Sequence, residues 1–541
     1  MKTAASFLLF LSCAISLFAA VDYTAEGQLW WAHIEFLAND GMQGRDTGSK
    51  EFRKAVEYVA GKFESLGLKP GGTSAYMQPV KFETRLLNPA KSSAVLVRDG
   101  KREPIVLGKD ATLSARGDLV PVVRAPMVFV GYGLVIPEVN YDDLAGINVK
   151  GKIAVVINAA GPVQADGNIK SHYGSGVERW NSLHKAGAIG IAVIQNPRTA
   201  GTQGTPATAA GRGAAPPPPP PPAVMLADPS LSETKGQNVT LTILREGGPK
   251  FFEGSEHSFD EIFKLAADNQ PLPHFPLAAT LEVKVRAKRD SMEAANVVGI
   301  LPGSDPKLKD EYVIFSAHLD HVGVGRPVND DAIYNGVMDN ASGVASVLEV
   351  ARLFHDSGFK PKRSVIFLTV TGEEKGELGS RFFAAHPTVP RGQIVADINL
   401  DMFLPLYALK VLEVQGLAES TLGDAVRVAA KEEGVDVQTD REPEQNRFIR
   451  SDQYSFIREG VPALAFKFGY EFGSPEEKTR LAWVKERYHR PSDDLTQPLD
   501  KAAAAKFNHV IFNLLKSVAD NPARPSWKQE SFFRRFAASG N

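Results

Sequence analysis

Hydrophobic positions in the first half of the chain follow two different spacings. Between Gln28 and Leu68 they recur at helical spacing on both sides of a Gly-containing loop, residues 39–45, which predicts two helices. Short apolar runs bounded by turn residues then predict strands, and an amphipathic stretch predicts a helix over 180–188. The strands predicted in this half are 93–97, 126–133, 152–157 and 189–194.

The second half has a more regular pattern, in which apolar strands alternate with helical stretches after Asn296. The strands predicted here are 312–315, 364–370, 394–400 and 461–468. This alternation predicts an α/β fold with a doubly wound mixed sheet flanked by helices. Ligands of such sheets bind beyond the carboxyl ends of the strands, so polar residues at those ends are the candidates for chemistry.

Length and composition narrow the classes of protein. At 541 residues the chain exceeds one ordinary domain, which predicts two folded units or one unit with a large insertion. A hydrophobic fraction of 43% excludes a disordered protein. A net charge of -2 excludes a strongly basic protein that binds polyanions, so no nucleic-acid partner is expected. The Gly, Ala and Pro residues of 199–222 predict an exposed extended loop, with an SH3-type ligand as the alternative.

The N-terminus has the pattern of a secretory signal. Lys2 precedes an apolar run, residues 7–18, and the small residues Ala19 and Ala20 follow it, which predicts a cleaved signal over 1–20 and a secreted or periplasmic protein. The run is shorter than the roughly 20 residues of a spanning helix, so no membrane span is expected. A lipoprotein acylated at Cys13 is the alternative; since this is the single cysteine, disulfides are not expected in the mature chain.

Candidate metal ligands follow three of the predicted strands. His318 comes just after the first, and the Asp320 carboxylate is placed to orient it from outside the metal. Glu373 and Glu374 follow the second strand, where their side chains diverge, so that one holds a metal while the other faces its bound water. Asp401 directly follows the third, where a buried carboxylate is costly unless it is paired or coordinated.

Two further candidates lie in turns. Asp339 stands at the entrance of a predicted helix, where helix capping is the alternative, and His489 lies in a turn with Asp493 within reach. Three carboxylates, Asp339, Glu374 and Asp401, reduce the four positive charges of two divalent cations to one, which a bridging hydroxide cancels. Nitrogen and carboxylate ligands without thiolates predict a catalytic pair of zinc ions, with Co²⁺ or Mn²⁺ as alternative metals.

The order of these residues resembles the motifs of metallopeptidase family twenty-eight, which includes zinc aminopeptidases, glutamate carboxypeptidases and glutaminyl cyclases. The motifs are His318-Leu319-Asp320, Asp339-Asn340-Ala341-Ser342-Gly343, Glu373-Glu374, Asn399-Leu400-Asp401-Met402 and Tyr488-His489. The segment 119–281 resembles the smaller β-rich protease-associated (PA) domain that many members carry as an insertion. The resemblance implies a peptidase domain divided into 21–118 and 282–525, followed by a tail over 526–541.

The resemblance also implies roles for single residues. Asp339 bridges the two metals, with a cis peptide bond to Asn340; His318 and Asp401 hold one metal, and Glu374 and His489 hold the other. Glu373 is the implied general base and Tyr488 the implied donor to the oxyanion. Arg450 is the implied contact to the substrate backbone.

These residues predict an exported zinc aminopeptidase that hydrolyses the N-terminal peptide bond of peptides, with Glu373 as general base to a metal-bridging hydroxide. A carboxypeptidase or dipeptidase of the same fold is the first alternative. A glutaminyl cyclase, which uses one metal, and a non-catalytic binding protein are the others. The sequence does not predict an oligomeric state.

Overall fold

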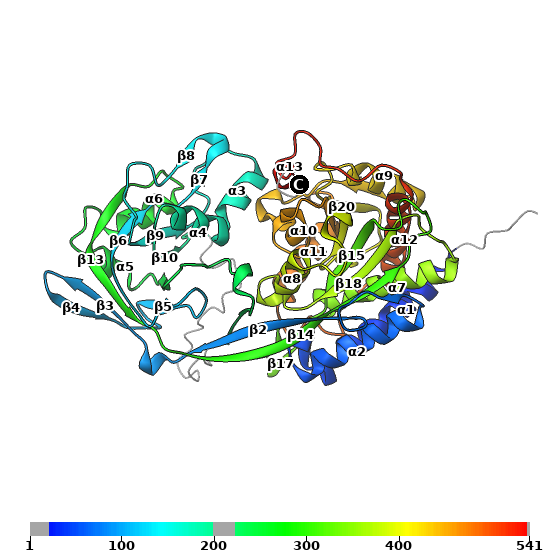
Figure 1. Ribbon diagram of the computed structural model, residues 1–541, viewed down its shortest axis with the longest axis horizontal. Coiled ribbons are helices and arrows are strands. Elements are labelled where there is room, and N and C mark those ends of the chain that lie inside the picture. The colour runs from blue at the N-terminus through cyan, green and yellow to red at the C-terminus, as the bar shows by residue number, and fades with distance from the viewer. Residues whose placement is uncertain (1–20, 199–221, 538–541) are drawn as a thin grey trace, which may run out of the picture.

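Two lobes make up the computed structural model, which describes residues 21–198 and 222–537 (Figure 1). The predicted signal, 1–20, and all but the last residue of the predicted loop 199–222 lie outside the described residues. Within the described part of the chain, no helix combines the length and apolar character that crossing a membrane requires. The lobes are joined by two long antiparallel strands, β2 (Met77–Leu87) and β14 (Ala287–Leu301).

The larger lobe is built on a ten-stranded sheet in the order β11-β2-β14-β18-β15-β19-β22-β20-β21, with β1 paired to β14. Its central strands β18, β15, β19 and β22 are parallel, and β14 and β20 flank them in antiparallel orientation. The mixed α/β sheet expected from the sequence is therefore confirmed. The other strands of this sheet are β1 (Lys69–Pro70), β11 (Ala223–Leu226), β15 (Tyr312–His318), β18 (Ser364–Val370), β19 (Ile394–Leu400), β20 (Val411–Gln415), β21 (Asp436–Gln438) and β22 (Ala463–Phe468).

Both faces of this sheet are buried, which explains why its central strands are continuously apolar. In β15, Val313 and Phe315 belong to the large core under one helical layer, while Ile314 packs into a smaller core on the other face. One layer contains α1 (Tyr23–Leu37), α2 (Lys50–Ser65), α7 (Ser342–Ser357), α9 (Leu422–Glu432) and α12 (Lys501–Asp520). The opposite layer contains α8 (Leu378–Ala385) and α10 (Gln453–Arg458).

The smaller lobe has its own eight-stranded sheet, in the order β4-β3-β13-β6-β9-β10-β12-β5. This sheet takes in β3 to β5, which precede the predicted start of the insertion at residue 119, because β3 pairs with β13. The strands are β3 (Ser93–Arg98), β4 (Lys101–Ile105), β5 (Ala111–Leu113), β6 (Val122–Val130), β9 (Ile153–Asn158), β10 (Gly190–Gln195), β12 (Thr240–Ile243) and β13 (His274–Lys284). The helices of this lobe are α3 (Gly167–Gly174), α4 (Gly176–Lys185), α5 (Gly248–Phe252) and α6 (Phe259–Ala267).

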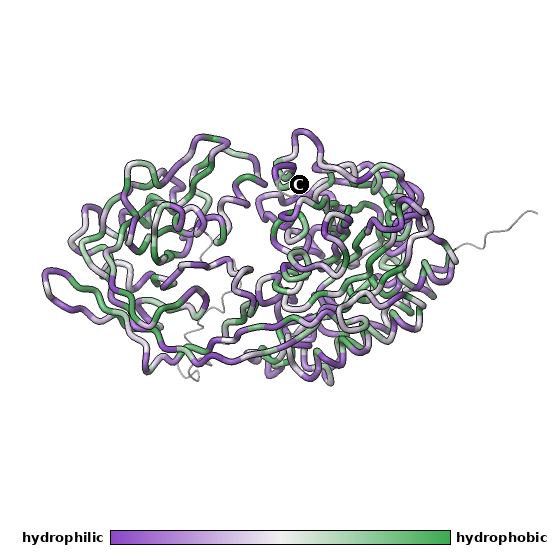
Figure 2. The backbone as a smooth tube through the Cα atoms, viewed as in Figure 1, coloured by the Kyte–Doolittle hydropathy of each residue, from purple (hydrophilic) through white to green (hydrophobic). Residues whose placement is uncertain are grey.

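The remaining elements are short or lie at the edges of the lobes. They are α11 (Pro475–Glu486), α13 (Arg534–Ala537), the β16–β17 hairpin (Gly323–Val328 and Asp331–Tyr334) and the β7–β8 pair (Val135–Ile136 and Tyr141–Asp142). Figure 2 shows that hydrophobic stretches of the backbone follow the strands of both lobes. Six of the eight predicted strands, and the helix predicted over 180–188, differ from the observed elements at one or both ends, whereas the strands predicted over 364–370 and 394–400 coincide with β18 and β19. The helix predicted over 180–188 is α4, which begins earlier because the Ser175 hydroxyl caps it, and the strand predicted over 312–315 extends to His318.

Polar contacts fix the smaller lobe against the larger one. His172 Nδ1 lies 2.7 Å from the Tyr454 hydroxyl, and the Arg116 guanidinium donates to the carbonyl oxygen of Lys375 at 2.8 Å.

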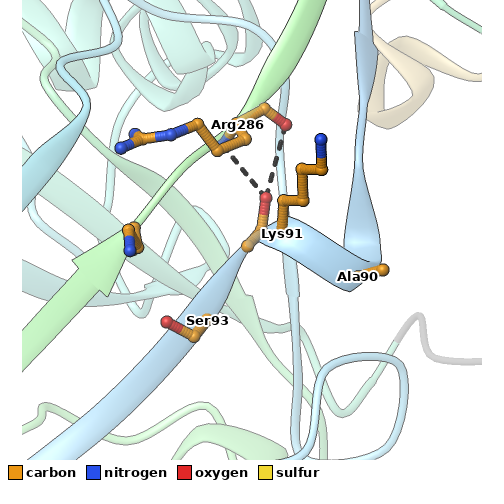
Figure 3. A pocket seen from close by; sticks show the side chains of 6 residues that line it. Ala90, Lys91, Ser93 and Arg286 are labelled. Carbon is orange, nitrogen blue, oxygen red and sulfur yellow. Dashed lines mark hydrogen bonds between the residues drawn. The ribbon is translucent and has the colours of Figure 1, made fainter.

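At the joint between the sheets, an open depression of about 400 Å³ lies beside Lys91 and Arg286 (Figure 3). In it the Ser92 hydroxyl accepts from the Arg286 amide at 3.0 Å. None of its lining residues is a candidate metal ligand.

Candidate metal centre

Three neighbouring parallel strands bring candidate ligands to one edge of the larger sheet. His318 is the last residue of β15, Asp401 directly follows β19, and Glu374 lies four residues beyond the end of β18. Because β15 pairs with both β18 and β19 in parallel, the carboxyl ends of these three strands lie together.

The Asp339 carboxylate lies between two groups of donors. Its Oδ1 is 3.2 Å from His318 Nε2, which in turn lies 3.7 Å from Asp401 Oδ1. Its Oδ2 is 3.2 Å from His489 Nε2, which lies 3.4 Å from Glu374 Oε2. The structure therefore brings the five residues proposed as ligands into one cluster, with one oxygen of Asp339 facing each group.

The donor atoms of this cluster fit a pair of zinc ions. His318 Nε2, Asp401 Oδ1 and Glu374 Oε1 are buried and have no hydrogen-bond partner in the described chain. Two ligands at the usual Zn–N and Zn–O distances of about 2.0–2.1 Å, in a tetrahedral arrangement, lie roughly 3.3 Å apart. The separations of 3.2–3.7 Å from His318 and His489 to the carboxylates match that spacing.

Backbone contacts hold Asp339 in place. It lies in a turn, Val337–Ala341, that leads into α7, and its peptide bond to Asn340 is cis, as the resemblance implies. The Asp493 carboxylate accepts from the amides of Met338 at 2.9 Å and Asp339 at 3.1 Å. Asp493, which the sequence places near His489, thus pairs with main-chain amides of the Asp339 turn.

Asp320 also has partners other than the expected ones. His318 Nδ1 lies 3.1 Å from the main-chain oxygen of Asp320, so the backbone and not the carboxylate orients this imidazole. The Asp320 carboxylate instead accepts from the Thr47 hydroxyl at 2.7 Å and from the Glu373 amide at 3.2 Å. Thr47, which the sequence did not single out, lies in the segment between the first two helices and connects it to the centre.

The Glu373 segment is a tight turn held from three sides. Gly372 and Gly376 flank it with positive φ angles of 69° and 107°, a conformation that favours glycine. Lys375 pairs with Asp46 at 2.7 Å, Arg116 of the smaller lobe binds the Lys375 carbonyl, and Asp320 binds the Glu373 amide. Burial raises the pKa of Glu373 well above its ordinary value, which suits a carboxylate that accepts and returns a proton.

Tyr488 and Arg450 have different positions relative to the centre. The Tyr488 ring stacks on His489 with ring centroids 4.1 Å apart, and 38% of the residue is exposed. Partial burial of the side chain and the negative charge of Asp339 raise the pKa of Tyr488, so its hydroxyl stays a donor at neutral pH. Arg450 is exposed and donates to the carbonyl of Gln445 at 3.1 Å; within the described chain no contact joins it to the metal ligands.

One residue of the cluster was not among the expected ligands. His321 is fully buried, and its Nδ1 lies 2.7 Å from Glu374 Oε1. The sequence contains a signal for it, since a second histidine follows His318 and Asp320 in the same motif.

Comparisons with known proteins agree with this geometry. Residues 296–515 match the model of Peptidase family M28, a segment that contains all five expected ligands. A protein of Aspergillus oryzae named probable leucine aminopeptidase 2 is 28% identical over 231 residues, 40% of this chain and 44% of the relative. A Xenopus laevis protein named Carboxypeptidase Q is 29% identical over 133 residues, 24% of this chain and 26% of the relative.

The overall fold also has a counterpart among solved structures. The aminopeptidase from Aneurinibacillus sp. strain AM-1 aligns with a TM-score of 0.52 and 20% identity, covering 92% of this chain and 95% of that one. The curated relatives above match over less than half of their own length. The family-model match and the order of the ligands along the sheet lead to one conclusion: the part of the chain that carries the metal centre belongs to peptidase family M28.

Proposed function

We propose that this protein is an exported zinc-dependent aminopeptidase. The observation that carries the proposal is the Asp339 carboxylate, with one oxygen toward His318 and the other toward His489, beside the protonatable Glu373. The names of the matched relatives support an exopeptidase, and the aminopeptidase name belongs to the longer of the two matches. The pattern of residues 1–20 supports export.

Two zinc ions would be held by the residues already described. His318 and Asp401 would bind one ion, Glu374 and His489 the other, and Asp339 both. Zinc bound there would lower the pKa of a bridging water toward about 7 and polarise the scissile carbonyl. Nitrogen and carboxylate donors also accept Co²⁺ or Mn²⁺.

The protein's own groups carry the proton transfers. Glu373 takes the proton of the attacking water and later gives it to the departing amine, and burial, which raises the pKa of this carboxyl above its ordinary value, favours its holding the proton between the two steps. The Tyr488 hydroxyl donates a hydrogen bond to the oxyanion that forms from the scissile carbonyl. The turn between Gly372 and Gly376 keeps Glu373 and Glu374 on the same loop but directed to different partners.

The family contains carboxypeptidases and glutaminyl cyclases as well as aminopeptidases. Assays with a substrate typical of each class distinguish these three functions. We expect the protein to release the residue from aminoacyl anilides and to leave N-blocked dipeptides intact. A chelator should abolish the activity and lower the melting temperature, because the ions bind only the folded chain. Added zinc, cobalt or manganese should restore both. Cleavage of blocked dipeptides alone would favour a carboxypeptidase, and loss of ammonia from N-terminal glutamine would favour a cyclase.

The role of Glu373 predicts that Glu373→Gln lowers kcat by about 10²–10⁴-fold, the usual contribution of a general acid–base group. Its zinc content should stay unchanged, because this carboxylate is not among the proposed ligands. The matched variant Glu374→Gln should instead lose zinc, which mass spectrometry of the dialysed protein measures. Normal turnover by Glu373→Gln would contradict the proposed mechanism.

The role of Tyr488 predicts a different result. Tyr488→Phe keeps the ring that stacks on His489 and removes only the hydroxyl, so zinc content should not change. Its kcat should fall by about 10²-fold, as expected for the loss of one donor to the oxyanion. Steady-state kinetics with an aminoacyl anilide measures this effect; a kcat equal to that of the wild type would assign the oxyanion to another donor.

A further inference from the structure

His321 is held inside the protein by its backbone and by a neighbouring glycine. Its main-chain amide donates to the carbonyl of Arg45 at 3.3 Å, and its ring lies against Gly336, where an added Cβ would come within 2.5 Å of the ring. The residue is 0% exposed, and within the described chain neither ring nitrogen has a hydrogen-bond partner. A buried imidazole whose nearest polar atom is a carboxylate oxygen without an aligned donor leaves both groups unsatisfied unless a proton or a cation lies between them.

The ring points at the second group of metal donors. Nδ1 is 2.7 Å from Glu374 Oε1 and 3.9 Å from Asp339 Oδ2, and these three donors lie within 4.8 Å of one another. Nδ1 and Oε1 lie within hydrogen-bond distance, so either a proton on Nδ1 or a cation shared by the two groups would satisfy both atoms. Together with Asp339 Oδ2 they form a group of donors that could hold a cation.

We propose that His321 is a protein ligand of the cation that Asp339, Glu374 and His489 hold. This inference rests on the metal pair of the proposed function but not on the peptide substrate. It makes the two metal positions unequal. The position at His318, Asp339 and Asp401 would have three protein ligands, whereas the position at His321, Asp339, Glu374 and His489 would have four.

Zinc titration of two variants tests the assignment. His321→Ala removes the ligand, and His321→Asn keeps a side-chain N–H that could donate to Glu374 but removes the imidazole lone pair. Both variants should lose one of the two zinc ions or bind it about 100-fold more weakly. The loss of a direct ligand should weaken binding at least as much as the loss of a side chain that only hydrogen-bonds to a ligand. The control is His355→Ala, an exposed histidine of α7 that should leave both affinities unchanged.

The possible results separate the alternatives. Wild-type affinity for both ions in His321→Asn would make His321 a hydrogen-bond donor that positions Glu374, and wild-type affinity in His321→Ala would remove it from the centre. Melting curves of the metal-free variants check that each is folded. If a variant does not fold, X-ray absorption of the wild-type protein with zinc remains decisive: it should show three imidazoles shared by two ions, and two would overturn the proposal. These experiments measure zinc affinity, folding and zinc coordination, and none of them depends on peptide hydrolysis.

Discussion

The Asp339 carboxylate, buried between two sets of nitrogen and oxygen donors, is the interaction on which the rest of the centre depends. Each of its oxygens faces a different histidine, at 3.2 Å in both cases. A buried carboxylate surrounded by Glu374 and Asp401 is costly unless positive charge lies between them. The surrounding structure is arranged to hold it: Asp493 binds the amides of its turn, and Asn340 donates to the carbonyl at the end of β19.

Parts of the chain that are distant in sequence support the same loop. Thr47 and Asp46, between the first two helices, reach Asp320 and Lys375, and Arg116 of the smaller lobe binds the Lys375 carbonyl. The Glu373 turn is therefore connected to the N-terminal segment, to β15 and to the smaller lobe at once. This gives the smaller lobe a structural connection to the loop that carries the proposed general base.

The sequence predicts the strands and the ligands of the site better than it predicts the hydrogen bonds that hold those ligands in place. The strands 364–370 and 394–400 have the predicted bounds because they are buried on both faces and read as continuous apolar runs. Polar residues after such strands identify the expected ligands, since parallel neighbours end at one edge. The partners of the Asp320 and Asp493 carboxylates could not be predicted, because each carboxylate binds main-chain amides, which almost every residue offers and no motif marks. Thr47 could not be predicted either, because only a tertiary contact brings its hydroxyl to Asp320.

Anomalous diffraction from a zinc-loaded crystal, measured on both sides of the zinc absorption edge, tests the central claim most directly. The proposed metal pair predicts two zinc peaks, one on each side of the Asp339 carboxylate and each about 2 Å from one of its oxygens. A single peak, or two peaks that do not share Asp339, would contradict a bridged pair of metals and with it the proposed reaction.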